Sequence, residues 1–183
     1  MKSSEVRAVK NRILQAAVEL VAEEGFHNLS MRKIARRMNI SAPTIYYYYA
    51  NKDELNIAIR KRAGEILYRR MSAAYRSGRD VRERGWRMIK AYLDFGLGMP
   101  DYYAIMFDST APKHSDYIGT DLEEAAREEL ASSMRNAELM WGILREFKRE
   151  GYRMPGDVER LGMVLWSELH GLVSLHNNNL FKE

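Results

Sequence analysis

One stretch of this sequence, residues 29–55, constrains the fold most, because three helix starts follow one another within it. Ser30, Ser41 and Asn51 each carry a side chain that can accept hydrogen bonds from the free N–H groups of a first helical turn. An apolar residue directly before each cap can pack against another one four residues after it. These pairs are Leu29 with Ile34, Ile40 with Ile45, and Ala50 with Leu55, and Glu54 stands at capping-box spacing from Asn51.

Two further residues favour a sharp turn between the first two of these helices. Asn39 tolerates the left-handed backbone conformation that ends a helix. Pro43 falls in the first turn of the second helix, where its missing N–H breaks no hydrogen bond. Together, these features predict a helix-turn-helix, whose second helix can enter the major groove of DNA.

The predicted second helix, from Ala42 to Tyr49, carries more tyrosines than a core helix needs. We expect Ile45 and Tyr49 to point inward and the remaining side chains to be exposed. An exposed phenol can donate to a phosphate oxygen and place its ring against a base methyl group or a sugar. The alternative is a solvated helix with a few stray tyrosines. The surface expected to face DNA comprises Thr44, Tyr46, Tyr47 and Tyr48, with the basic residues Arg32, Arg36, Arg37 and Lys52 around them.

Over about residues 8 to 55 the sequence resembles the TetR family of transcriptional regulators. The chain departs from the family pattern at Tyr48 and Tyr49, where His then Phe is frequent, and at Asn39, where Gly is frequent. A tyrosine can still donate to phosphate and fill an aromatic slot, so these departures bear on the DNA sequence preferred rather than on binding. The motifs that carry the resemblance are Gly25-Phe26, Ser30, Ile34-Ala35, Thr44-Ile45-Tyr46, Tyr49 and Lys52-Asp53-Glu54-Leu55.

The resemblance also implies roles for individual residues in DNA binding. The residues expected to contact phosphates are Thr44, Tyr46, Tyr47, Tyr48 and Lys52. The residues expected to contact bases are Arg32, Ala42, Pro43 and Tyr46.

Composition excludes several other classes of protein. The 183 residues include no cysteine, which removes disulfide frameworks, thiolate nucleophiles and zinc sites that use cysteine. The four histidines, His27, His114, His170 and His176, lack metal-ligand spacing with one another, and no phosphate loop or catalytic motif occurs. We therefore expect no metal, no cofactor and no enzymatic activity. No apolar run approaches a membrane span and no signal peptide is evident, so we expect a soluble cytoplasmic protein.

Charge divides the chain. Residues 1–70 hold 14 Lys and Arg against 7 Asp and Glu, whereas residues 71–183 hold 15 against 18. A basic first part followed by a mildly acidic remainder is typical of a nucleic-acid-binding domain joined to a domain with another role.

Helical periodicity continues through the whole chain, and no strand pattern interrupts it. Beyond a frayed arm at Met1–Glu5, we expect an amphipathic helix over about residues 6–24, and later helices over about 81–98, 101–107, 122–150 and 157–177. The segment 108–121 is expected to be the longest loop and a mobile one. The basic run 60–62 and the pair 69–70 are expected to form a solvated face.

The predicted fold is therefore all-α. Residues 1–51 form a helix-turn-helix DNA-binding domain with three helices, residues 52–75 a connecting helix, and residues 76–183 a helical effector-binding and dimerisation domain. The connecting helix starts at Lys52, and in the resembled family it links the two domains.

The last two long helices each carry apolar residues at helical spacing, and two such helices from each of two chains can form a four-helix interface. The alternative is that both helices fill the core of their own chain. The residues are Leu130, Met134, Ala137, Trp141 and Leu144 in one helix, and Leu161, Leu165, Leu169, Leu172 and Leu175 in the other.

A second, shorter resemblance covers Trp166, His170 and Gly171, which match a Trp-x-x-x-His-Gly pattern in a subset of TetR C-terminal domains. His170 could donate a hydrogen bond to an effector, and it could equally be satisfied within the core. The family encloses a small hydrophobic or amphipathic effector among its C-terminal helices, and soft side chains suit either a cavity or a core. The candidate effector-binding residues are Trp86, Tyr92, Tyr103, Phe107, Trp141, Trp166 and His170.

The sequence thus predicts a homodimeric regulator that binds a palindromic operator in double-stranded DNA and acts as a repressor that a small effector releases. The alternative is a ligand-independent DNA-associated protein whose C-terminal domain docks another protein. A closed apolar cavity would favour the first hypothesis, and a filled core with an exposed apolar patch would favour the second.

Overall fold

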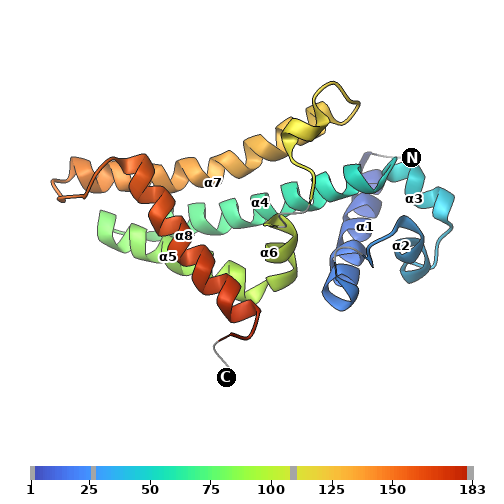
Figure 1. Ribbon diagram of the computed structural model, residues 1–183, viewed down its shortest axis with the longest axis horizontal. Helices are drawn as coiled ribbons and strands as arrows, with labels where there is room; N and C mark the ends of the chain where they lie inside the picture. Colours follow the sequence, from blue (N-terminus) through green and yellow to red (C-terminus); the bar gives the residue numbers. More distant parts are fainter. Residues whose placement is uncertain (1–2, 26–27, 108–110, 181–183) are drawn as a thin grey trace. The chain divides into compact units, whose positions relative to one another are not determined.

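The computed structural model describes residues 3–25, 28–107 and 111–180. These residues form helices and turns without any strand, which confirms the all-α fold (Figure 1). In chain order the elements are α1 (Ser3–Glu24), α2 (Met31–Arg37), α3 (Ala42–Tyr48), α4 (Lys52–Ser77), α5 (Val81–Gly98), α6 (Pro100–Met106), the 3-10 helix η2 (His114–Tyr117), α7 (Glu123–Arg149) and α8 (Val158–Asn177).

The helix-turn-helix forms with the predicted caps. Ser30 accepts a hydrogen bond from the Lys33 N–H at 3.3 Å, and Ser41 accepts one from the Thr44 N–H at 3.3 Å. Asn51 accepts from the Glu54 N–H at 2.8 Å. In a regular capping box, the Glu54 carboxylate would accept a hydrogen bond from the N–H of the cap residue Asn51. Here it accepts from the N–H of Ala50, one residue earlier, at 2.6 Å.

The turn between α2 and α3 depends on Asn39, which has a φ of 53°. The prediction of a left-handed residue here is confirmed. An asparagine occupies this region more readily than most residues, since its short polar side chain can bond locally. Phe26 and His27, which follow Gly25 in the predicted corner, lie outside the described residues.

Contacts divide the chain into two compact units: Met1–Arg62 with Ala104–Leu130, and Ala63–Tyr103 with Ala131–Glu183. In the first unit, α1, α2 and α3 contact one another. Ile13 and Ala17 of α1, Ile34 of α2 and Ile45 of α3 are fully buried. The apolar stripe expected on the first helix is therefore the core of this three-helix arrangement. Helix α1 already begins at Ser3, so the expectation of a frayed arm is wrong for residues 3–5.

The segment after α6 is more ordered than a loop. It contains η2, and Tyr117 at the end of η2 is buried with Ile57 and Ala126 in an apolar cluster of the first unit. The prediction of one long loop over residues 108–121 is thus wrong for the part that forms η2, and residues 108–110 lie outside the described residues. Packing of the Tyr117 ring against Ile57 and Ala126 holds this segment in place.

Arg60 lies in the same unit and corrects a second expectation. The run 60–62 was expected to be solvated, yet Arg60 is only 4% exposed. Its guanidinium donates to the Pro112 carbonyl at 2.7 Å and lies 3.6 Å from the Glu129 carboxylate. Burial of a charge is tolerated only where such partners compensate for the lost water. The sequence indicates this burial by spacing, because Arg60 precedes Ala63 by three residues and Leu67 by seven. Residues at this spacing lie on one side of α4, and Ala63 and Leu67 are buried.

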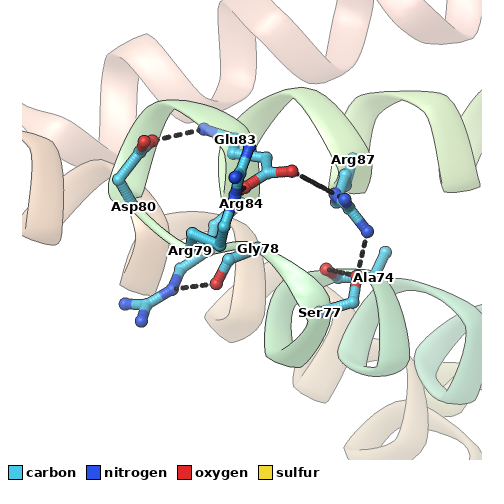
Figure 2. A network of polar contacts seen from close by, with 8 residues as sticks. All are labelled: Ala74, Ser77, Gly78, Arg79, Asp80, Glu83, Arg84 and Arg87. Atoms are coloured by element: carbon cyan, nitrogen blue, oxygen red, sulfur yellow. Dashed lines mark hydrogen bonds and ion pairs between the residues drawn. The ribbon is translucent and has the colours of Figure 1, made fainter.

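In the second unit, the α4–α5 corner is held by hydrogen bonds between neighbouring residues (Figure 2). Asp80 caps α5 by accepting from the Glu83 N–H at 2.8 Å. The Glu83 carboxylate accepts from the Arg79 N–H at 2.9 Å and from the Arg87 guanidinium at 2.6 Å. The bond from the Arg79 N–H, followed by those from the two arginine side chains, lowers the pKa of Glu83 to about 2. The predicted start of a helix at about residue 81 is confirmed, and α4 ends at Ser77, two residues beyond the predicted connecting helix.

Helices α5 and α8 pack closely in this unit. A Cβ added to Gly96 would lie 2.6 Å from a Val173 methyl carbon, so only glycine fits at this crossing. The Asn177 amide donates to the Gly96 carbonyl at 3.1 Å. Among the residues that the structure describes, no helix is long and apolar enough to cross a membrane.

Candidate DNA-binding surface and C-terminal polar chain

Helix α3 has one buried side and one exposed side. Ile45 is fully buried and Tyr49, the C-terminal cap, is 3% exposed, as expected. Tyr46 is 49% exposed and Tyr47 is 74% exposed, also as expected. Tyr48 is different, since only 8% of it is exposed. The expectation of an exposed Tyr48 is wrong because Tyr48 follows Ile45 by three residues and therefore shares its buried side.

The remaining candidates on this surface differ in exposure. Arg32 and Pro43 are exposed, whereas Ala42, Thr44 and Lys52 are half-buried. The Thr44 hydroxyl is 2.8 Å from the Ser41 hydroxyl, within the cap of α3. The structure therefore brings Pro43, Tyr46 and Tyr47 to one exposed face of α3.

The basic residues of α2 fall into two groups. Lys33 forms an ion pair with Glu24 of α1, and Arg37 forms one with Glu23. The hydrogen bond from Lys33 lowers the pKa of Glu24. Arg37 was expected on the DNA side, but its guanidinium turns to α1, so that expectation is corrected. Arg32 and Arg36 are exposed, and neither forms an ion pair within the described part of the chain.

Lys10 of α1 contacts the end of α3. Its ammonium group lies 4.9 Å from the centre of the Tyr49 ring, in a cation–π contact. Burial raises the pKa of Tyr49, and the neighbouring Glu54 carboxylate raises it further, so this phenol stays protonated.

The second unit contains a chain of polar side chains centred on Tyr103. The Tyr92 and Tyr103 hydroxyls are 2.9 Å apart, and both side chains are buried. The Tyr103 hydroxyl is 2.6 Å from His170 Nδ1, and His170 Nε2 is 3.4 Å from the Ser174 hydroxyl. The Trp166 indole also hydrogen-bonds to Tyr92.

The Trp166 indole can only donate, whereas each phenol oxygen can both donate and accept. Tyr103 has a single hydroxyl proton, so it donates either to Tyr92 or to His170 Nδ1, and the two hydrogen bonds are coupled. Burial lowers the pKa of His170, which favours the neutral ring. The His170 ring is also stacked against Tyr103 and Trp166, with ring centres 5.5 Å and 5.4 Å apart.

Of the seven candidate effector residues, the structure therefore brings four together: Tyr92, Tyr103, Trp166 and His170. Trp86 is 68% exposed, so it does not line an internal site. The buried side of α5 is set by Met88 and Tyr92, and Trp86 points the opposite way because it precedes Met88 by two residues.

The last two candidates also lie apart from this cluster. Trp141 is half-buried and packs on α8, since a Cβ at Gly162 would lie 2.6 Å from its ring. Phe107 is half-buried and belongs to the other compact unit. Within the described residues, no group of three or more His, Asp or Glu side chains could hold a metal ion.

A capped helix-turn-helix with an exposed aromatic face on its second helix defines a DNA-binding protein of the helix-turn-helix class. Comparison with known proteins agrees. Residues 13–59 match the family described as "Bacterial regulatory proteins, tetR family", and residues 86–183 match the "Tetracyclin repressor-like, C-terminal domain". The chain belongs to the TetR family, and it is a DNA-binding transcriptional regulator rather than an enzyme. The resemblance inferred from the sequence is confirmed.

Curated relatives match over part of their length. The chain is 28% identical over 123 residues to the transcriptional activator FasR of Mycolicibacterium smegmatis, covering 67% of this chain and 53% of FasR. It is 36% identical over 59 residues to the fatty acid metabolism regulator protein of Bacillus subtilis, covering 32% of this chain and 30% of that protein. The matched region thus spans about half of the first relative and less than a third of the second.

Solved structures share the fold. The TetR family regulator PfmR from Thermus thermophilus superposes with a TM-score of 0.73 at 21% identity, over 89% of this chain and 85% of that one. The fatty acid degradation regulator FadR from Bacillus halodurans gives a TM-score of 0.72 at 21% identity, over 94% of this chain and 84% of that one. The all-helical architecture is therefore that of known TetR regulators.

Proposed function

We propose that this protein is a cytoplasmic homodimer that binds a palindromic operator through α3 and represses transcription until a small hydrophobic or amphipathic effector releases it. The observation that carries the proposal is the exposed face of α3, on which Tyr46 and Tyr47 stand in a helix-turn-helix that is capped at each helix start. We divide the chain for this function as residues 1–51, 52–75 and 76–183.

We propose the same DNA contacts that the matching positions of the TetR family imply. Phosphates are contacted by Thr44, Tyr46, Tyr47, Tyr48 and Lys52, and bases by Arg32, Ala42, Pro43 and Tyr46. Burial of Tyr48 limits its role to what its hydroxyl can reach at the edge of the core. One short helix covers few base pairs, so two copies spaced about 34–36 Å apart are needed to recognise an operator.

The dimer is supported by an unpartnered apolar face on α8. Val164, Leu172 and Leu175 recur at helical spacing and are 48%, 50% and 40% exposed. Monomeric proteins seldom leave such a stripe in water, and a two-fold axis would let the same stripe cover itself in a second copy. Of the other predicted seam residues, Leu161, Leu165 and Leu169 are half-buried, so they are shared between this face and the chain's own core.

The effector is assigned to the second unit, near Tyr92, Tyr103, Trp166 and His170. Two of the similar proteins are named for fatty acid metabolism or degradation, which favours an effector with an apolar chain. Release requires that the effector bind one spacing of the two recognition helices better than the other. The continuous helix α4 is the element that could carry this change.

The same exposed stripe on α8 also favours the alternative, a DNA-associated protein that docks a different protein. FasR is named an activator, so repression needs a direct test. A reporter gene placed behind the operator distinguishes the two directions: repression predicts more transcript when the protein is removed, and activation predicts less.

The dimer is tested by placing a charge on the stripe. Leu172→Glu should convert the dimer into a monomer in light scattering and abolish operator binding, because two carboxylates would face each other across the axis. Leu97→Glu makes the same change at a leucine of α5 that is 41% exposed, and it should leave both properties intact. A wild-type protein that is monomeric while bound to its operator would overturn the proposed dimer and favour the docking protein.

A further inference from the structure

The exposed face of α3 has an unusual chemistry for a surface that reads DNA. It presents Pro43, Tyr46 and Tyr47 beside the half-buried Ala42, and none of these side chains carries a charge or an amide group. The other residues of the helix either turn inward, as do Ile45 and Tyr48, or belong to the cap.

This composition restricts how bases can be recognised. In the major groove, guanine is read mainly by the paired donors of Arg or Lys, and adenine by the amide of Asn or Gln. Helix α3 has none of these residues. The apolar feature on a base edge in this groove is the C5-methyl group of thymine, which accepts contact from apolar and aromatic side chains. The chemistry of the face therefore matches methyl groups better than hydrogen-bonding edges.

The basic residues of α2 differ in whether their charged groups already pair with a carboxylate of α1. Lys33 and Arg37 of α2 are engaged by Glu24 and Glu23 of α1. Arg32 and Arg36 remain exposed without an ion pair in the described part of the chain. Both belong to α2 and not to the helix that is proposed to enter the groove, so their contribution falls outside the contacts of α3.

We propose that α3 selects its operator by contact of Pro43 and the Tyr46 ring with pyrimidine C5-methyl groups, so that the part of each half-site beneath α3 is rich in T·A pairs. The inference rests on the proposed operator binding and adds the base chemistry that is read. The same methyl group occurs in thymine and in 5-methylcytosine, and the test below separates these two sources.

The test replaces thymine by deoxyuridine, which lacks only the methyl group. An operator duplex obtained by selection from random DNA is synthesised with deoxyuridine at each half-site thymine in turn, and binding is measured by fluorescence anisotropy. Loss of one buried methyl contact should weaken binding about fourfold. The same replacement outside the half-sites should have no effect. Equal affinity for the thymine and deoxyuridine operators at every position would overturn the inference.

Two substitutions assign the contact to a side chain. Tyr46→Phe keeps the ring and should keep the fourfold penalty, whereas Tyr46→Ala should remove it, so that both operators bind equally. If the Tyr46 hydroxyl acts only on a phosphate, the two variants will instead lose affinity alike and the penalty will persist in both. Binding of each variant to random DNA, together with its circular dichroism spectrum, shows that it is folded.

A final pair of duplexes distinguishes the methyl group from the rest of the base. A T·A pair that shows the penalty is replaced by C·G and by 5-methylcytosine·G. Recovery of affinity with the methylated cytosine means that the methyl group is read in either base, and no recovery restricts the inference to thymine. Failure of the chain to select any motif would overturn the proposed function itself, whereas a selected motif that is insensitive to methyl removal would overturn only this inference.

Discussion

The helix-turn-helix and the second compact unit of this protein depend on different kinds of contact. Within residues 29–55, each helix start is fixed by bonds between residues three or four apart, such as Ser41 with Thr44 and Asn51 with Glu54. In the second unit, the bonds that join different helices link residues far apart in the sequence, such as Tyr103 of α6 with His170 of α8. Local contacts can be read from spacing in the sequence, whereas distant contacts depend on how the chain folds back. Four predictions test this difference.

The largest effect is expected at Arg60, which is buried against Glu129 and the Pro112 carbonyl. Arg60→Leu removes the guanidinium and leaves the carboxylate in a site that is only 13% exposed. Loss of one partner of a buried pair costs about 3–5 kcal/mol. Chemical denaturation should show this loss in the free energy of unfolding. The control is Arg60→Leu combined with Glu129→Leu, which should recover most of the stability; an unchanged midpoint in the single variant would contradict the buried pair.

The next effect is expected at the α5–α8 crossing. Gly96→Ala would place a methyl group 2.6 Å from Val173, and overpacking of this kind costs about 1–3 kcal/mol. Gly98→Ala is the matched control, since nothing lies within 4 Å of its Cβ position. Thermal unfolding of the two variants should differ clearly. Equal melting temperatures would mean that the helices are not in close contact at Gly96.

A smaller effect is expected for a local contact. Ser41→Ala removes the cap of α3 and should cost about 1 kcal/mol, because a first-turn N–H loses its acceptor. Ser41→Asn retains an acceptor and should restore the stability. Both effects can be measured by denaturation and by operator affinity. Identical denaturation midpoints for Ser41→Ala and the wild type would contradict this contribution of the cap.

The smallest effect concerns pH. Burial lowers the pKa of His170 below its ordinary value of 6.5, so the unfolded chain binds more protons than the folded one near and below that pH. The contribution of His170 to the free energy of unfolding is complete above pH 6.5 and declines as the pH falls toward the lowered pKa. His170→Gln should flatten this decline, whereas His176→Gln, at an exposed histidine, should not. The slope between pH 7.5 and 5.5 is the measurement, and identical slopes in both variants would refute the assignment.

The difference between the two regions also explains what could be predicted from the sequence. The three caps, the turn at Asn39 and most helix limits followed from residue type and spacing. The side on which Tyr48 lies could have been obtained from its spacing to Ile45. The ion pair between Arg37 and Glu23, and the pairing of Arg60 with Glu129, could not be obtained in this way. Each depends on which carboxylate another helix brings near, and spacing within one helix does not encode that.

The candidate effector residues show the same limit. Four of the seven come together as a polar chain, because Tyr92, Tyr103 and the Trp166–His170 pair lie on the buried sides of three helices that pack on one another. Residue type alone selected Trp86 as well, although helical phase places it on the outer side of α5. Phase relative to a neighbouring buried residue is therefore a better guide to these positions than aromatic character.

The measurement that tests the central claim most directly is selection of binding sites from random double-stranded DNA by the chain of 183 residues. A dimer that reads DNA through α3 predicts one palindromic motif, whose half-sites are centred about 10 base pairs apart or a multiple of that distance. Recovery of no motif above background, or of a motif without two-fold symmetry, would contradict the account.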